Sequence, residues 1–231
     1  MELLVAELAQ GLLEKLEKLD PGQRLLVGLT GIPASGKTSL AHAVVNKVND
    51  VHKQSSPGSL NIAIMIGLDG WHLPRSTLAA MPNSKEAFAR RGAHWTFDGE
   101  GYVKFVAKLR APGLVNAPSF SHSAKDPVED DIQVQSHHRI ILLEGLYVFL
   151  SIEPWVVAGS MLDERWLVDV DLDDAKERIV KRHVETGVTA TEKEATHRAE
   201  ENDFPNGEFV LGHILEPTRR IKSINDPSIA T

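Results

Sequence analysis

Residues Gly31 to Thr38 read G-I-P-A-S-G-K-T, which matches the pattern G-x-x-x-x-G-K-[ST] at every position. Its glycines permit backbone conformations and close approaches that a Cβ atom would prevent. Successive backbone N–H groups can then converge on a phosphate at the positive end of a following helix. Lys37 would reach the β- and γ-phosphates, and the Thr38 hydroxyl would bind Mg²⁺. The motif predicts a nucleotide site that comprises Gly31, Ile32, Pro33, Ala34, Ser35, Gly36, Lys37, Thr38 and Ser39.

The segments on either side of the motif have the character that a phosphate-binding loop requires. The apolar run over 24–29 suits a buried strand. After the motif, Leu40, Val44, Val45 and Val48 recur at the spacing of one helix face. Strand, glycine-rich turn and helix form the context in which this motif binds phosphate, so the flanks argue against a chance match.

Two acidic residues end the next two apolar segments. Asp69 follows the run over 62–68, and Glu144 follows the run over 139–143. Because ligands of parallel sheets bind beyond the carboxyl ends of the strands, both carboxylates are expected beside the phosphate loop. One acid could accept the proton of an attacking hydroxyl, and one could hold Mg²⁺. Spacing does not decide which acid does which, and either could instead cap a helix or end a strand.

A pair of arginines could supply positive charge above the same edge. Arg178 and Arg182 lie one turn apart on a charged helix expected over 173–186, so they share a face. Such a pair can close over a transferring phosphate and neutralise charge in the transition state. A solvated helix face is the alternative, and the spacing does not choose between the two. Together with a helix expected over 191–201, this segment forms a lid-like unit over about 173–201.

The order of apolar and charged segments predicts an α/β fold with a single domain over 1–231. Strands that alternate with helices indicate a parallel sheet with helices on both faces, here a three-layer αβα sandwich with a small helical lid. Strands are expected over 24–29, 62–68, 139–143 and 166–170, with a short one at 114–117. The other helices are expected at 1–19, 38–49, 76–90 and 100–110. Loops or turns are expected over 52–59, 119–131 and 202–207.

Composition excludes several classes of site. The 231 residues carry a net charge of −7 and include no cysteine, which removes disulfides, thiolate nucleophiles and cysteine-ligated metals. The negative charge argues against extended nucleic-acid binding. No run approaches the ~20 apolar residues that cross a membrane. The amphipathic N-terminal helix lacks the cationic start of a signal peptide. A cytoplasmic protein without a membrane or nucleic-acid partner is expected.

Further motifs resemble the uridine kinase and phosphoribulokinase group of small-molecule P-loop kinases, which includes pantothenate and glycerate kinases. The resemblance runs from about residue 25 to 206 and is strongest with the fungal and bacterial uridine kinase-like branch. The D-G-[FW]-H and T-F-D pieces make it more specific than the phosphate loop alone. In order, the motifs are L-D-G-W-H at 68–72, R-R-G-A-H-W-T-F-D at 90–98, P-S-F at 118–120, L-E-G at 143–145 and N-D-F-P-N at 202–206.

The resemblance implies a role for each matching position. Asp69 corresponds to the general base, Glu144 to an acid of the metal shell with Thr38 and Asp69, and Arg178 and Arg182 to lid arginines. Acceptor-binding positions would be Asp69, His72, Arg90, Asp98 and His122, and the nucleotide base would lie near Asn202 and Asn206. Relatives often carry Asp-Arg where this chain has Ser121-His122, so the identity of the acceptor stays open.

These observations together predict an ATP- and Mg²⁺-dependent kinase that phosphorylates a hydroxyl of a nucleoside, sugar or hydroxy acid. The alternative is a nucleotide-binding regulatory or assembly protein that has no small-molecule acceptor. A GTPase is less well supported, because N-K-x-D is absent from a suitable position. The choice of ATP over GTP and the assembly state, monomer or homodimer, stay open.

Overall fold

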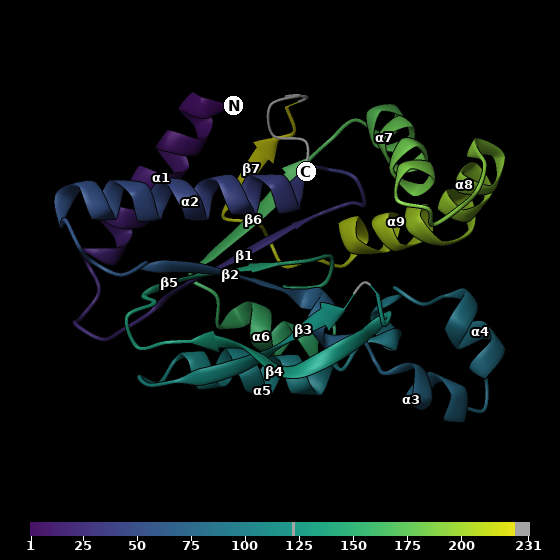
Figure 1. Cartoon of the computed structure of the whole chain (residues 1–231), viewed down its shortest axis with the longest axis horizontal. Helices are drawn as coiled ribbons and strands as arrows, with labels where there is room; N and C mark the ends of the chain where they lie inside the picture. The colour runs from purple at the N-terminus through teal and green to yellow at the C-terminus, as the bar shows by residue number, and fades with distance from the viewer. Residues whose placement is uncertain (122, 225–231) are drawn as a thin grey trace.

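The computed structural model describes residues 1–121 and 123–224. Its core is a five-stranded sheet in the order β2-β5-β1-β6-β7, and every neighbouring pair is parallel (Figure 1). The strands are β1 (Leu25–Gly31), β2 (Ala63–Gly67), β5 (Ile140–Glu144), β6 (Glu164–Asp169) and β7 (Arg219–Lys222). The predicted α/β fold is therefore confirmed.

Alternation along β1 divides the interior into two cores. Leu25, Val27 and Leu29 pack against the helices of one face, whereas Leu26 joins the core on the other face. Figure 1 shows α1 and α2 above the sheet and α5 and α6 below it. Their bounds are α1 (Glu2–Leu16), α2 (Lys37–Ser55), α5 (Gly99–Leu109) and α6 (Trp155–Ser160). A buried strand with two apolar faces thus produces the three layers.

Two smaller groups of elements complete the fold, the first of them beyond the carboxyl edge of the sheet (Figure 1). The first is a helical lid, which comprises α7 (Leu172–Glu185), α8 (Glu192–Arg198), the π-helical η3 (Ala199–Asp203) and α9 (Phe204–Gly212). The second comprises η1 (Leu68–Trp71), α3 (Arg75–Ala80), α4 (Ser84–Ala89), η2 (His94–Thr96) and a hairpin of β3 (Val115–Ser121) and β4 (Asp126–Val134). Within the described part of the chain, every helix is too short or too polar to span a membrane.

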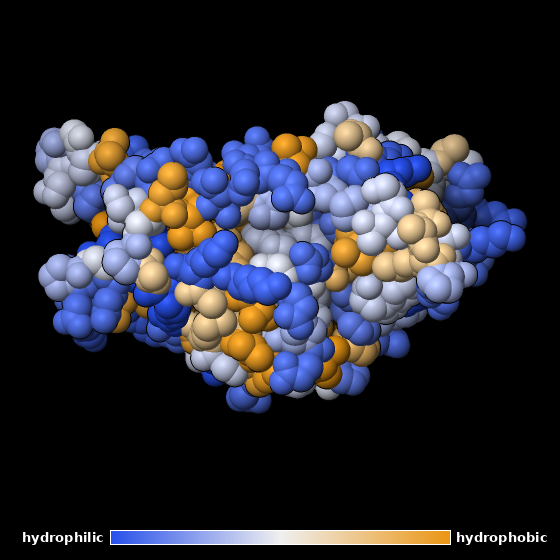
Figure 2. Space-filling model, turned by 90° about the horizontal axis from the view of Figure 1, so that it is seen from below, coloured by the Kyte–Doolittle hydropathy of each residue, from blue (hydrophilic) through white to orange (hydrophobic). Residues whose placement is uncertain are grey.

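The prediction of a loop over 119–131 was wrong, because most of this segment forms the β3–β4 hairpin. Most of β4 is exposed, so its sequence D-P-V-E-D-D-I-Q-V lacks the alternation that indicates a half-buried strand. On the face seen in Figure 2, apolar patches are separated by polar side chains. Strand β7 was also missed, since four residues with three charges give little strand signal.

The turn expected over 202–207 was wrong as well. This segment continues the helical path from η3 into α9, and Pro205 lies in the first turn of α9, a position that proline favours. Asparagine, glycine and proline mark turns in isolated sequence, yet here tertiary hydrogen bonds hold the segment helical. Helix α2 also runs further than expected, to Ser55, into the predicted loop over 52–59.

A buried arginine joins the start of β1 to two loops that lie far away in the sequence. Arg24 is 4% exposed, and its guanidinium donates to five backbone carbonyls. These acceptors belong to Leu109, Ala111, Gly113, Gln135 and His138. Burial lowers the pKa of Arg24, but the five acceptors compensate for the lost hydration of the cation.

Replacement of Arg24 by methionine should lower the free energy of unfolding by about 3 kcal/mol, because charged hydrogen bonds are lost and buried carbonyls lose their donors. Urea denaturation with a fitted midpoint and slope measures the loss. Arg139→Met is the matched control, since Arg139 also donates to two backbone carbonyls, those of Asp20 and Gln23, but from an exposed position. The control should lose about 1 kcal/mol or less; equal losses would contradict the assigned role of Arg24.

Candidate functional site

The phosphate loop has the backbone geometry that its sequence predicts. Gly36 occupies the left-handed region, with φ of 86°, and precedes the first turn of α2. Ala34 also has a positive φ, of 62°, which is uncommon for a residue with a Cβ atom. The Ser35 hydroxyl is buried and has no hydrogen-bond partner among the described residues. A Cβ atom on Gly31 would lie 2.5 Å from that hydroxyl and 2.8 Å from the Val168 carbonyl oxygen, so only glycine fits.

A cavity of about 460 Å³ opens beside the phosphate loop. Its wall brings together the loop and the two predicted lid arginines, Arg178 and Arg182. Arg178 is held in place by its donation to the Ser223 hydroxyl, 2.9 Å away. The remaining wall comes from the start of α1, from α2, β6, α7 and β7 and from the chain after β7, namely Met1, Leu4, Leu40, Val168, Lys181, Glu185, Ile221, Lys222, Ser223 and Ile224. The cavity therefore has a cationic end at the phosphate loop and an apolar portion beside it.

The register of three strands brings both predicted carboxylates to this edge. Glu144 at the end of β5 is the register partner of Leu29 in β1 and of Gly67 in β2, so β2 and β5 end level and β1 runs on to Gly31. Glu144 is 8% exposed, and its Oε1 accepts a hydrogen bond from Thr38 Oγ1 at 3.2 Å. Asp69 lies in η1, just beyond the end of β2, and its side chain is 63% exposed. One acid is thus buried beside the loop and the other faces solvent.

The charges of these groups influence one another. Burial lowers the pKa of the Lys37 ammonium, whereas Glu144 counteracts that shift. The nearby Arg182 lowers the pKa of Lys37 further, and the carboxylates of Asp69 and Asp203 raise it. Burial in turn raises the pKa of Glu144, and Lys37 opposes this. Groups from the loop, from two strand ends and from the lid therefore share one electrostatic environment.

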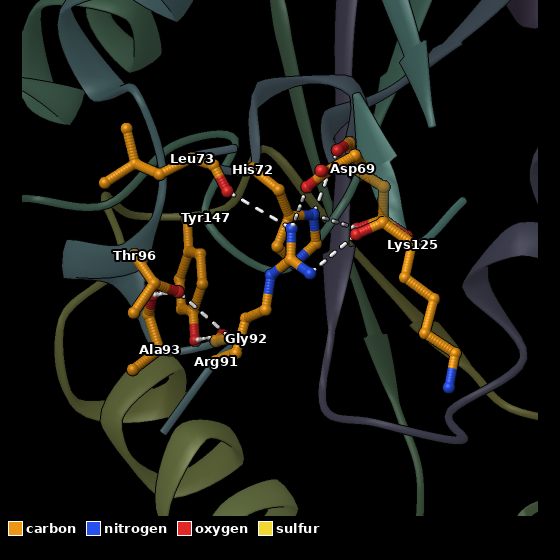
Figure 3. A network of polar contacts seen from close by, with 10 residues as sticks. Asp69, His72, Leu73, Arg91, Gly92, Ala93, Thr96, Lys125 and Tyr147 are labelled. Atoms are coloured by element: carbon orange, nitrogen blue, oxygen red, sulfur yellow. Dashed lines mark hydrogen bonds and ion pairs between the residues drawn. The ribbon is translucent and has the colours of Figure 1, made fainter. Parts of the chain in front are cut away.

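Beside Asp69 lies a second set of residues, of which Figure 3 shows His72 at close range. The Nδ1 atom of His72 is 2.9 Å from the Asp69 backbone oxygen and 3.8 Å from its carboxylate. The imidazole ring packs on Phe97, with ring centroids 4.0 Å apart, and on Phe120 at 4.9 Å. Asp98 caps α5, since its Oδ1 accepts from the Gly101 N–H at 2.8 Å. His72 and Asp69 thus form one unit, and Asp98 has a local structural partner.

The structure also identifies an arginine that the sequence analysis missed. The Arg91 guanidinium lies between the segment after Asp69 and the β3–β4 hairpin (Figure 3). Its neighbour Arg90 was predicted to bind the acceptor, but it donates to the Glu201 carbonyl and to Asn206 Oδ1. The only sequence signal for Arg91 was its place as the second arginine of R-R-G.

The two asparagines expected near the nucleotide base have partners elsewhere. Asn202 donates to the Arg91 carbonyl at 3.2 Å, and Asn206 donates to Asn202 Oδ1 at 3.4 Å. Neither asparagine lines the cavity beside the phosphate loop. The predicted acceptor residue His122 lies outside the described residues.

Comparison with known proteins adds a family to this geometry. No protein-family model matches the chain. An ATP-dependent kinase-like protein of Aspergillus versicolor, notR', is 47% identical over 64% of this chain and 89% of its own length. A candidate uridine kinase of Schizosaccharomyces pombe is 34% identical over 93% of this chain and 90% of its own length.

A solved structure agrees with these relatives. It is that of a candidate fructose transport system kinase from Silicibacter sp., which superposes with a TM-score of 0.79 at 27% identity. The match covers 94% of this chain and 98% of that one. Similarity of sequence and fold thus extends over nearly the whole chain, far beyond the phosphate loop. The chain belongs to the uridine kinase-like family of P-loop kinases.

Proposed function

We propose that this protein transfers the γ-phosphate of ATP to a hydroxyl of a small polar metabolite, with Mg²⁺ as cofactor and Asp69 as general base. The observation that carries the proposal is the exposed Asp69 carboxylate, which lies at the same edge of the sheet as Lys37 of the phosphate loop and Glu144 of β5. A protein that only senses a nucleotide has no need of an exposed base at this place. The relatives support the same class, since they are named as kinases.

The residues beside the loop fit a magnesium ion. Thr38 Oγ1, Glu144 and Asp69 offer oxygen atoms, which Mg²⁺ prefers, and this ion usually keeps several waters and takes only one or two carboxylates. Among the described residues, no three His, Cys, Asp or Glu side chains cluster as a metal site. When bound, Mg²⁺ neutralises charge on the β- and γ-phosphates.

The proposed step is an in-line displacement at the γ-phosphorus. The acceptor oxygen forms a bond to phosphorus while its proton passes to the Asp69 carboxylate. At the same time the bond from phosphorus to the β,γ-bridging oxygen breaks, and that oxygen leaves with its electrons as part of ADP. Lys37 stabilises the negative charge, and Arg178 and Arg182 are placed to do so from the lid.

The acceptor belongs to a class of small polar molecules rather than to a named compound. The relatives are named for uridine and for fructose transport, so nucleosides and sugars both belong in a screen with glycerate and pantothenate. His72 contacts Asp69, and the hairpin packs on η1, which carries Asp69. The Asp98 N–H donates to the Trp71 carbonyl at 2.7 Å, so we assign the acceptor to this side of Asp69. A cytoplasmic location, where ATP and such metabolites occur, is part of the proposal. A regulatory P-loop protein would instead bind ATP without phosphorylating any member of the screen.

Replacement of Asp69 by asparagine should lower kcat about 1,000-fold while nucleotide affinity stays close to that of the wild type, because the base is lost and the loop is intact. Coupled ADP release with the screened acceptor measures kcat, and calorimetry with AMP-PNP measures binding. Lys37→Ala should lose nucleotide binding as well. Asp50→Asn, at an exposed position of α2, is the control and should behave as the wild type. An Asp69→Asn enzyme with wild-type kcat would refute the assigned base.

A second test addresses the backbone that carries Asp69. A Cβ atom on Gly70 would lie 2.3 Å from the Pro118 carbonyl oxygen, so Gly70→Ala must push η1 away from β3 and displace Asp69. A displacement of about 1 Å can lower a rate about 100-fold, and we expect such a loss in kcat with nucleotide binding retained. Gly67→Ala is the matched control, since nothing lies within 4 Å of its Cβ position. Equal activities of the two variants would contradict the prediction.

A further inference from the structure

Two adjacent arginines reach in different directions from the loop between α4 and η2. Arg91 donates to the Lys125 carbonyl at 2.6 Å, to Asp126 Oδ1 at 3.0 Å and to the Leu73 carbonyl at 3.2 Å (Figure 3). Its side chain is 14% exposed. One guanidinium thus ties the hairpin to the segment that follows Asp69.

The contacts of Arg91 continue to the proposed base. The guanidinium lies over the Phe120 ring, 5.8 Å from its centroid, and Phe120 in turn packs on His72. His72 contacts the Asp69 backbone oxygen. The carboxylate of Asp126 also accepts from the Arg75 N–H at 2.8 Å, which fixes the same segment a second time. Loss of Arg91 would therefore release both walls beside Asp69.

Arg90 makes the opposite connection, to the lid. It donates to the Glu201 carbonyl and to Asn206, while Asn202 donates to the Arg91 carbonyl. These acceptors and donors lie in η3 and α9. The π-helical turn is thus bound to the same loop that holds the hairpin. Such turns are frequent at functional sites.

That loop is itself held against the body of the protein. Gly92 has φ of 110°, and its N–H donates to Thr96 Oγ1 at 3.0 Å. The Tyr147 hydroxyl donates to the Gly92 carbonyl at 2.7 Å (Figure 3). Because the N–H and the carbonyl of Gly92 are both hydrogen-bonded, this glycine does not act as a flexible hinge after Arg90 and Arg91.

The far end of the lid reaches the phosphate loop. His183 of α7 is buried and lies 3.5 Å from the Asp203 carboxylate of η3. The preceding residue, Arg182, lines the nucleotide cavity. A continuous series of contacts therefore runs from the nucleotide cavity through α7 and η3 to Arg90, and from Arg91 to the walls beside Asp69.

We propose that Arg90 and Arg91 are positioning residues that transmit nucleotide binding at the lid to the acceptor side of the site. Phosphate charge in the cavity would attract Arg178 and Arg182 and so move α7. Because α7 contacts η3, the contacts of Arg90 with η3 and α9 would shift in turn. Arg91 then orders the hairpin around Asp69. The inference rests on the proposed function, because it assigns the hairpin to the acceptor side. Coupling of this kind would favour transfer to a bound acceptor over hydrolysis of ATP by water.

The decisive experiment is hydrogen exchange of the hairpin, residues 119–134, with and without saturating AMP-PNP and Mg²⁺. In the wild type we expect exchange there to slow about tenfold on nucleotide binding, although the hairpin does not line the nucleotide cavity. Arg90→Met should abolish the difference between the free and bound states. Arg91→Met should do the same from the other side, so either variant suffices if the other fails to fold. Saturation of each variant is checked by titration.

Arg139→Met is the control for removal of a guanidinium from backbone carbonyls, and it should keep the nucleotide-dependent slowing. A role in stability alone would change exchange in the free and bound states alike and leave their difference intact. The proposal is overturned by that result, or by a wild-type hairpin that does not respond to nucleotide.

Kinetics supply an independent readout. With an acceptor found in the screen, Arg90→Met should lower kcat and raise the ratio of ATP hydrolysis to acceptor phosphorylation, with the KM for ATP unchanged. A raised KM for ATP with unchanged kcat would contradict a positioning role. If no acceptor is phosphorylated by the wild type, the proposed function fails, whereas the exchange experiment still decides whether the two arginines couple lid and hairpin.

Discussion

The parallel register of β2, β5 and β1 is the constraint on which the whole site depends. In this register β2 and β5 end together and β1 runs two residues further, which places the loop after β1, the Glu144 carboxylate and the Asp69 segment along one edge. No side-chain contact would achieve this alone, because each group is carried by a different part of the chain. The apolar residues of the two cores fix that register through burial on both faces of the sheet. The packing of the two cores therefore also determines the geometry of the site.

Burial strengthens the electrostatic interactions between the charged groups at this edge, so that the pKa of each group depends on the charges of the others. Lys37 and Glu144 each lose hydration, and each offsets part of that cost for the other. A triphosphate adds negative charge where Lys37, Arg178 and Arg182 already supply positive charge. The Asp69 side chain remains exposed, in contrast to that of Glu144. Burial thus distinguishes the acid held beside the loop from the acid proposed as base.

Sequence predicted the features that local pattern specifies, which are the four long core strands, the phosphate loop and the carboxylates at strand ends. It failed for β4, where polar residues face solvent, and for the turn at Asn202, where side-chain bonds to Arg91 and Arg90 keep the chain helical. Arg24 and Arg91 carry no local signal, because their partners lie far away in the chain. Such tertiary hydrogen bonds become visible only when the fold is assembled.

The groups beside the cavity differ in the kind of element that carries them. The phosphate loop and the two carboxylates are carried by strand ends, whose backbone is fixed by the sheet, whereas Arg178 and Arg182 are carried by a helix outside it. A helix with few core contacts can adjust to a ligand at lower cost than a central strand can. Connections between lid and acceptor wall must then be made by long side chains with several donors. Arginine meets that need, since one planar guanidinium can bind two or three carbonyls in different segments.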